Sequence, residues 1–267
     1  MTQVRRLWPL LTATFRYDKT VSTYQRGHGQ VIEAPVLAYL IETANGRILY
    51  DVGCDYSKVA DPLARARWYG GEEAFPVPEM SASQRIPHHL ARLGLTAADV
   101  DVVFVGHLHF DHVGGLNELR QCGCGAEIHL HQDEWDAAIT GQDHAVFADE
   151  LRDDAGVPLP FRMQRAEYTV VPGVQAVNTP GHTAGHMSMW IELPKGPPVL
   201  LCGDAADLQE NLDDEVAPGT LWQGREQQAI DSIRKLKRLA GETGAQLWPN
   251  HDMSFYRSLP AFPHCCE

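Results

Sequence analysis

Short runs of apolar residues, each bounded by turn-forming residues, recur along the chain. Runs of this length that are rich in β-branched and large aliphatic residues are typical of strands, several of them buried. The N-terminal segment MTQVRRLWPLLTATFRYDK is interpreted as a first strand, because Pro9 and the threonines interrupt its apolar patch. The sequence ANG at 44–46 predicts a hairpin. Further strands are predicted at 36–43, 48–53, 101–106, 126–131, 174–179, 186–193, 199–204 and 245–250.

Helical spacing is clearest in residues 225–240, where the apolar side chains share one face and Gly241 offers a C-cap. Shorter helices are expected within 83–95 and from Gly115 to about Leu119. Residues 55–80 and 141–168 show no clear pattern, and loops of that length in a compact domain are usually lids or binding loops. Because no repeat or linker divides the chain, we expect residues 1–267 to form a single α/β domain.

Charge and composition restrict the partners. The formal net charge is −13, which disfavours nucleic acid and anionic lipid and favours a small neutral substrate. No apolar run approaches the roughly 20 residues of a membrane helix, and no export signal is recognised. We therefore expect a cytoplasmic protein with reduced cysteines, and the sequence leaves open a homodimer.

The segment GHLHFDHVGG, residues 106–115, concentrates metal-binding side chains directly after a predicted strand. It contains His107, His109, Asp111 and His112. Neutral imidazoles suit zinc, and a carboxylate supplies charge. An isolated HxH is usually a polar loop, but HxHxDH between a buried strand and two glycines is far more specific. The cluster can hold one ion with three ligands or contribute to two.

Three further candidate ligands follow other predicted strands. His182 lies just past the strand at 174–179, Asp204 ends the strand at 199–204, and His251 lies just past the strand at 245–250. Side chains at the carboxyl ends of successive strands can converge at one edge of a sheet. Together, the five histidines and two aspartates suit two metal ions bridged by one carboxylate.

These segments resemble the metallo-β-lactamase superfamily, and within it the N-acyl-homoserine-lactone lactonases. The resemblance covers nearly the whole chain, since ILYDVG, HLHFDHVGG, TPGHTAGH, VLLCGDAAD and the final HD fall in the expected order. It implies a four-layer αββα sandwich, the metallo-β-lactamase fold, with a dinuclear metal site at one edge. Two divalent ions are implied, with zinc as the first expectation; iron, manganese and cobalt also suit such donors.

The resemblance also assigns roles by position. His107, His109 and His182 would bind the first ion, and Asp111, His112 and His251 the second, with Asp204 bridging them. Asp51 in ILYDVG matches an aspartate that orients the ligand loops in the family. His186, in TPGHTAGH, is expected to support a ligand rather than bind an ion.

The activity implied is hydrolysis of a lactone. A hydroxide held between the ions would attack the ring carbonyl of an N-acyl-homoserine lactone, a quorum-quenching reaction, with Asp111 steering the nucleophile. Two alternatives remain open: a lactonase for another small lactone, either γ-butyrolactone-like or ring-fused such as 4-pyridoxolactone, and an iron-bound oxidoreductase on the same scaffold.

One position departs from the family pattern. Related lactonases carry a tyrosine three residues after the bridging aspartate, where its hydroxyl helps polarise the carbonyl, and this chain has Asp207 there. Asp207 is a catalytic candidate alongside Asp111, but an aspartate polarises a carbonyl only when protonated. Either another group replaces the tyrosine or the substrate differs. Candidate pocket residues are Tyr24, His28, Trp68, Tyr69 and Phe75.

Overall fold

A computed structural model describes residues 2–70, 76–141, 143 and 145–267, and it contains two β-sheets. The larger sheet has the strand order β1-β2-β3-β4-β5-β6, and the smaller has the order β11-β10-β9-β8-β7. The strands of the larger sheet are β1 (Val4–Asp18), β2 (Val31–Thr43), β3 (Gly46–Tyr50), β4 (Val102–Phe104), β5 (Glu127–His131) and β6 (Phe161–Gln164). Those of the smaller sheet are β7 (Tyr168–Val171), β8 (Val174–Asn178), β9 (Met187–Ile191), β10 (Val199–Leu201) and β11 (Gln246–Trp248).

The pairing of the strands explains why the loops that follow several of them meet. In the larger sheet β1, β2 and β3 pair antiparallel, with Thr43 opposite Gly46 at the predicted hairpin, while β3 to β6 pair parallel. In the smaller sheet β10 and β11 pair parallel. The carboxyl ends of parallel strands lie at the same edge of a sheet, so the segments after β10 and β11 emerge together, and so do those after β3, β4 and β5.

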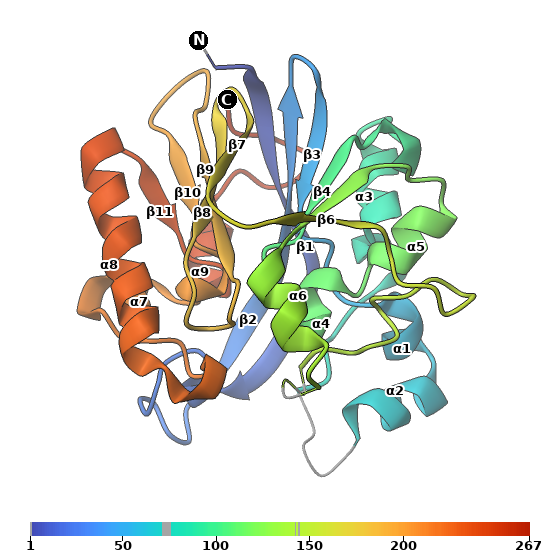
Figure 1. Ribbon diagram of the computed structural model, residues 1–267, viewed down its shortest axis with the longest axis horizontal. Helices are drawn as coiled ribbons and strands as arrows, with labels where there is room; N and C mark the ends of the chain where they lie inside the picture. The colour runs from blue at the N-terminus through green and yellow to red at the C-terminus, as the bar shows by residue number, and fades with distance from the viewer. Residues whose placement is uncertain (1, 71–75, 142, 144) are drawn as a thin grey trace.

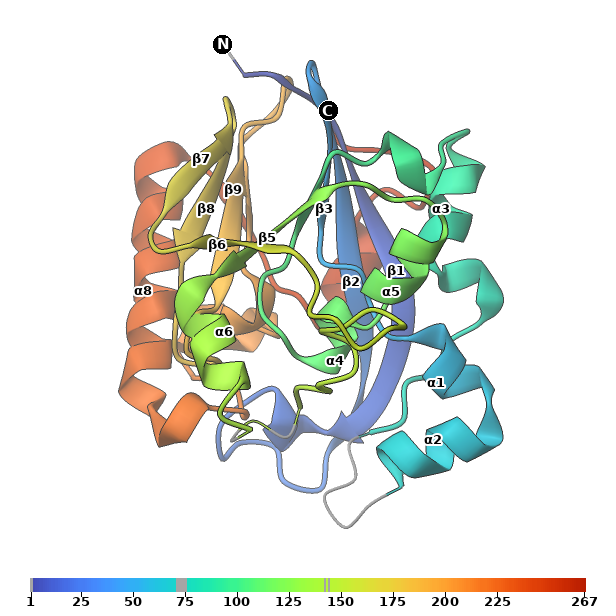
Figure 2. The ribbon, with the colours of Figure 1, turned by 45° about the vertical axis from the view of Figure 1, so that its right-hand side comes forward.

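Helices cover the outer faces of both sheets (Figures 1 and 2). The helix α8 (Glu226–Thr243) packs Ile233 and Leu236 against Leu200 of the smaller sheet. On the other side, α3 (Ile86–Arg92) and α5 (Leu116–Gln121) cover the larger sheet. The expected four-layer αββα arrangement is therefore confirmed. The remaining α-helices are α1 (Tyr56–Ala60), α2 (Pro62–Tyr69), α4 (Phe110–Val113), α6 (Gln132–Ala138), α7 (Gln209–Asp214) and α9 (Met253–Ser258).

The space between the sheets is filled by large buried side chains. Tyr50 of β3 stacks on Phe104 of β4 with ring centroids 5.7 Å apart, and Tyr39 contacts Trp248 across the sheets at 6.1 Å. Burying such aromatic rings contributes strongly to stability. The Tyr50 hydroxyl donates to the Met187 carbonyl at 2.8 Å, so this core fixes the two sheets relative to each other.

Two predictions about local structure were wrong. The predicted C-cap, Gly241, lies inside α8, and the helix ends at Thr243 because Gly244 adopts the left-handed conformation (φ 72°) and donates to the Ala240 carbonyl. The segment 55–80 is not irregular throughout, since Asp55 caps α1 and Asp61 caps α2 by accepting backbone N–H groups. The segment 141–168 likewise contains β6 and the start of β7.

In the described part of the chain, no helix combines the length and the hydropathy that a membrane crossing requires.

Candidate metal centre

The seven side chains predicted as ligands meet at one edge of the sandwich. His107 and His109 lie between β4 and α4, and Asp111 and His112 lie in α4 itself. The other three follow strands of the smaller sheet: His182 after β8, Asp204 after β10 and His251 after β11. Potential ligand atoms of His107, His109, His182 and Asp204 lie within 4.8 Å of one another, and those of Asp111, His112 and His251 form a second such group.

Asp204 lies between the two groups of side chains. Its Oδ2 is 3.4 Å from His182 Nε2 and 3.7 Å from His107 Nε2. Its Oδ1 is 3.3 Å from His112 Nε2 and 3.2 Å from His251 Nε2. Oδ2 is also 3.2 Å from His251 Nε2. The carboxylate therefore lies within reach of both groups, as expected of a bridging carboxylate.

Four of the histidines have their outer ring nitrogen within hydrogen-bonding distance of an oxygen. His112 Nδ1 lies 2.8 Å from Asp51 Oδ2, and His109 Nε2 lies 3.0 Å from Asp143 Oδ2. The other two outer nitrogens face backbone carbonyls, His182 Nδ1 that of Thr220 at 3.1 Å and His251 Nδ1 that of Pro35 at 2.8 Å. Such partners fix the tautomer and leave the inner nitrogen with a lone pair.

Most of the inner nitrogens face acceptors rather than donors. His109 Nδ1 and His182 Nε2 are 3.1 Å apart, and both carry lone pairs when the outer nitrogens hold the protons. Neither ring nitrogen of buried His107 has a hydrogen-bond partner in the described structure, and His112 Nε2 has none either. The side-chain amide of Asn250 is a donor here, with its Nδ2 2.8 Å from Asp204 Oδ1 and 3.5 Å from His251 Nε2. The other converging atoms are acceptors, and acceptors that converge in this way require positive charge between them. These residues therefore fit divalent metal ions.

The charges at the site lead to the same conclusion. Burial lowers the pKa of His107 and His182 well below the usual value, so these imidazoles stay neutral and can act as ligands. Burial also acts to lower the pKa of His251, but the carboxylates of Asp204, Asp207 and Asp111 outweigh it and raise that pKa to about 10. The carboxylates thus attract a proton where no metal cation balances them.

Two tight backbone approaches hold the first ligand loop in place. Asp51 adopts a left-handed conformation (φ 60°) directly after β3, and its Oδ1 accepts the Gly106 N–H at 2.7 Å. A Cβ at Gly115 would lie only 2.3 Å from the Val52 carbonyl oxygen, so this loop can close against β3 only with glycine there. The prediction that Asp51 orients the ligand loops agrees with these contacts.

Two further buried residues support ligands from the second half of the chain. His186 Nε2 accepts the backbone N–H of Asp204 at 2.9 Å, and its Nδ1 bonds to Thr179 Oγ1 at 2.8 Å. Burial lowers the pKa of His186 to about 4, so it stays neutral. Glu134 of α6 accepts the backbone N–H groups of Leu108 at 3.0 Å and Gly185 at 2.9 Å, and it thereby joins the two ligand loops.

A pocket opens directly onto the metal centre. Its polar side is formed by ligands of the centre together with Asp207, whose ligand atom lies within 4.8 Å of those of Asp204 and His251. Its other walls come from β1, from the 3-10 helix Lys19–Val21, from α4 and from loops. The residues outside the ligand set are Phe15, Tyr17, Val21, Pro76, Phe110, Ala145, Asp207 and Thr220.

The aromatic residues predicted to line the pocket do not do so where the structure describes them. Tyr69 is buried with its ring 5.5 Å from that of Phe110, and Trp68 packs on Phe147 at 5.0 Å, so both anchor their helix to the core instead. Tyr24 and His28 lie in the turn after β1, half-buried and exposed respectively. Phe75 lies outside the described residues.

Sequence reasoning missed the residues that do form the pocket and support the ligands. Asp143 and Glu134 lie in no recognised motif. The partners from Pro35 and Thr220 are backbone carbonyls, which residue type does not identify. Phe15 and Tyr17 could have been found, because their alternation at the end of the predicted first strand places both side chains on one face.

A buried ion cluster lies behind the Phe110 wall of the pocket. Lys58 of α1 is only 4% exposed, and its Nζ lies 2.8 Å from Glu150 Oε1 and 2.8 Å from Asp149 Oδ2. The same nitrogen is 4.1 Å from the centre of the Trp68 ring. Phe147 stacks on Phe110 at 4.9 Å. We call Lys58, Asp149, Glu150 and Trp68 the Lys58 cluster; it fixes α1 and α2 against the loop that carries Ala145.

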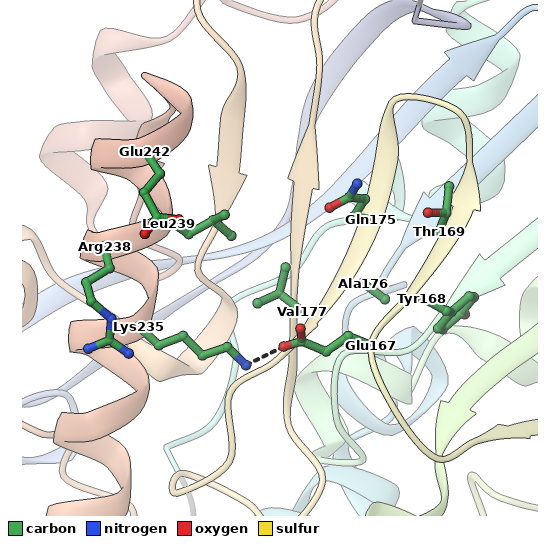
Figure 3. A pocket seen from close by; sticks show the side chains of 10 residues that line it. All are labelled: Glu167, Tyr168, Thr169, Gln175, Ala176, Val177, Lys235, Arg238, Leu239 and Glu242. Atoms are coloured by element: carbon green, nitrogen blue, oxygen red, sulfur yellow. Dashed lines mark hydrogen bonds and ion pairs between the residues drawn. The ribbon is translucent and has the colours of Figure 1, made fainter.

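A wider groove elsewhere on the surface is chemically different. It lies between α8 and the hairpin of β7 and β8, and an ion pair between Lys235 and Glu167 crosses it (Figure 3). Arg238 and Glu242 add further charged side chains from α8. No histidine or cysteine is among the described residues that line it, so the chemistry resides in the pocket beside Asp204.

Comparison with known proteins agrees with this geometry. The sequence profile of the Metallo-beta-lactamase superfamily matches residues 31–245. An N-acyl homoserine lactonase of Bacillus sp. is 32% identical over 237 residues, which cover 88% of each chain. The N-acyl homoserine lactonase AttM of Azorhizobium caulinodans is 29% identical over 270 residues, which cover 98% of each.

A solved structure is similar over the same length. It is an N-acyl homoserine lactone hydrolase with the product N-hexanoyl-L-homoserine bound at its catalytic metal center. It superposes with a TM-score of 0.84 at 29% identity and covers 99% of this chain and 100% of its own.

Proposed function

The chain belongs to the metallo-beta-lactamase superfamily, and from this premise we propose that it is a metal-dependent hydrolase that opens the ring of N-acyl homoserine lactones. One observation carries the proposal: seven buried histidine and aspartate side chains converge beside a pocket with their acceptor atoms turned inward. The named activity of the similar lactonases gives the substrate class.

The ligand roles in the proposal follow the two groups of side chains. His107, His109 and His182 hold one divalent ion, and Asp111, His112 and His251 hold the other. Asp204 would bind both ions, because its carboxylate lies within reach of both groups. We propose zinc as the native metal, since imidazole and carboxylate donors suit it, although iron, manganese and cobalt accept the same donors.

The reaction is hydrolysis of a cyclic ester. When bound, the two ions supply a nucleophilic water at neutral pH and a Lewis acid for the carbonyl. The carboxylate of Asp111, which lines the pocket, accepts the proton that the attacking water loses. The ring C–O bond breaks, the ring oxygen takes that proton, and the product is an open-chain hydroxy acid. Asp207, which lines the pocket with Asp111 and Asp204, is the other catalytic residue in the proposal.

The opposite wall of the pocket suits the apolar part of the substrate. Phe15, Phe110 and Ala145 are buried there, and Val21 and Pro76 complete the wall. Apolar walls with a few convergent polar groups are typical of small-molecule sites. The acyl chain of an N-acyl homoserine lactone matches this wall, while its ring carbonyl belongs beside Asp204.

The proposal is tested by metal analysis and a lactone panel. The purified protein is analysed for bound zinc, iron, manganese and cobalt, stripped with a chelator and reloaded with zinc. Ring opening is then measured on acyl-homoserine lactones of several chain lengths, on γ-butyrolactone and on an aromatic ring-fused lactone. We expect zinc-dependent opening with acyl-homoserine lactones preferred. Activity confined to thioesters or β-lactams would refute the lactonase assignment, and redox-active iron as the native metal would favour an oxidoreductase.

Asp143 is expected to tune metal binding although it binds no ion itself. Asp143→Asn replaces the carboxylate that holds His109 Nε2, so the apparent affinity for zinc should fall by roughly 10- to 100-fold. Competition against a chromogenic chelator measures this fall. Asp136→Asn makes the same change at an exposed position on α6 and should leave the affinity unchanged. Equal affinities for the two variants would contradict the role given to Asp143.

A further inference from the structure

Asp207 is a buried carboxylate whose hydrogen-bonding capacity is not filled by the protein. It is 3% exposed and lines the pocket beside Asp204 and His251. Its Oδ1 has no hydrogen-bond partner in the described structure. A carboxyl oxygen can accept hydrogen bonds, and leaving it unpaired in a buried site is unfavourable. A molecule bound in the pocket can therefore complete the site by donating a hydrogen bond.

Two neighbouring hydroxyl groups hold the Asp207 carboxyl group in place. Ser22 forms a side-chain hydrogen bond with Asp207, and Ser22 Oγ lies 2.8 Å from the hydroxyl of Tyr17, which also lines the pocket. The carboxyl group is therefore fixed by Ser22, while its Oδ1 remains without a partner in the described structure. A carboxyl oxygen in this position can accept a hydrogen bond from a molecule in the pocket.

We propose that Asp207, oriented by Ser22 and Tyr17, binds an N–H donor on the substrate and so selects lactones with an amide next to the ring carbonyl. The inference rests on the proposed function, because it places the ester beside Asp204. In an N-acyl homoserine lactone the amide nitrogen is bonded to the carbon next to that carbonyl. With the carbonyl at the metal centre, the N–H therefore lies within one carbon of the group being attacked, in the pocket that Asp207 and Asp204 both line.

The test compares two substrates that differ by one group. N-Hexanoyl homoserine lactone carries the N–H, and α-hexanoyloxy-γ-butyrolactone has an oxygen in its place. The zinc-loaded wild-type protein should prefer the amide by at least about tenfold in kcat/KM, because a site built to accept a donor rejects the analogue that lacks it. Asp207→Ala should bring the ratio close to one. Asp213→Ala removes the same charge from an exposed position on α7 and should keep the wild-type ratio.

Binding of the two ring-opened products, measured by calorimetry, gives a second readout that needs no turnover. The amide product should bind more tightly than the ester product to wild-type protein and equally well to Asp207→Ala. A wild-type ratio near one, or a ratio that persists in Asp207→Ala, would overturn the inference. Loss of zinc from Asp207→Ala would also overturn it, because Asp207 would then be a metal ligand. If no lactone at all is opened by the wild-type protein, the proposed function itself is wrong and this inference fails with it.

Discussion

His109→Ala should abolish both metal loading and lactone opening. His109 Nδ1 faces His182 Nε2 at 3.1 Å, so removing the imidazole takes a ligand from the group around Asp204 and leaves Asp143 without its partner. The loss of kcat/KM should exceed the roughly 10- to 100-fold expected when only an outer partner is lost. Elemental analysis after zinc loading measures the first effect, and ring opening of N-hexanoyl homoserine lactone measures the second.

The control removes an imidazole from elsewhere. His88→Ala changes an exposed residue of α3 and should leave zinc content and turnover as in the wild type. Circular dichroism establishes that both variants are folded. A folded His109→Ala protein that keeps two zinc ions and its turnover would show that the ligand assignment is wrong.

Lys58→Met should destabilise the protein, and more so at high pH. Burial raises the pKa of Glu150 to about 8 despite the opposing charge of Lys58. The native state thus holds the Glu150 proton more tightly than the unfolded chain, so stability is lost as the pH rises from about 4.5 toward 8. Without Lys58 the native pKa of Glu150 rises further, and the loss continues above pH 8. We expect Lys58→Met to lower the free energy of unfolding by about 3 kcal/mol at pH 9 and by less at pH 6.

Urea unfolding of the zinc-saturated protein at both pH values measures the free energies of unfolding. The double variant Lys58→Met, Glu150→Leu should recover most of the loss at pH 9, because it leaves no unpaired buried charge. Lys195→Met breaks an exposed ion pair with Glu267 and should have little effect at either pH. If Lys58→Met lowers the free energy of unfolding equally at both pH values, the role assigned to Glu150 is contradicted.

The strands and the ligand set could be predicted because both leave local signals. Buried strands appear as apolar runs, and HxHxDH concentrates four ligands within six positions. His182, Asp204 and His251 each follow such a run directly, so their convergence follows from the geometry of a sheet edge. The short strand β6, FRMQ, carries no apolar run, and for that reason the segment containing it was predicted to be irregular.

The pocket was harder to predict because tertiary contacts decide which way an aromatic side chain points. Trp68 and Tyr69 lie in a segment that was expected to form a lid, but the core offers them Phe147 and Phe110, and they are directed there. Of the two long segments expected to hold the substrate, the described residues contribute only Pro76 and Ala145 to the pocket. Phe15 and Tyr17 of the pocket come from the end of β1. This strand is far from HxHxDH in the sequence, so the sequence does not indicate that the two are close in space.

The ligands follow strands of both sheets, so a bound ion would connect the two sheets. His109 and His182 are 73 positions apart in the chain, yet their ring nitrogens are 3.1 Å apart. An ion bound to both is a reversible cross-link that closes a long loop, much as a disulfide does. Because the unfolded chain does not present this set of ligands, each tenfold excess of free metal over its dissociation constant adds about 1.4 kcal/mol to the stability of the folded state. The lifetime of the protein in a cell thus depends on the supply of metal as well as on the packing of its core.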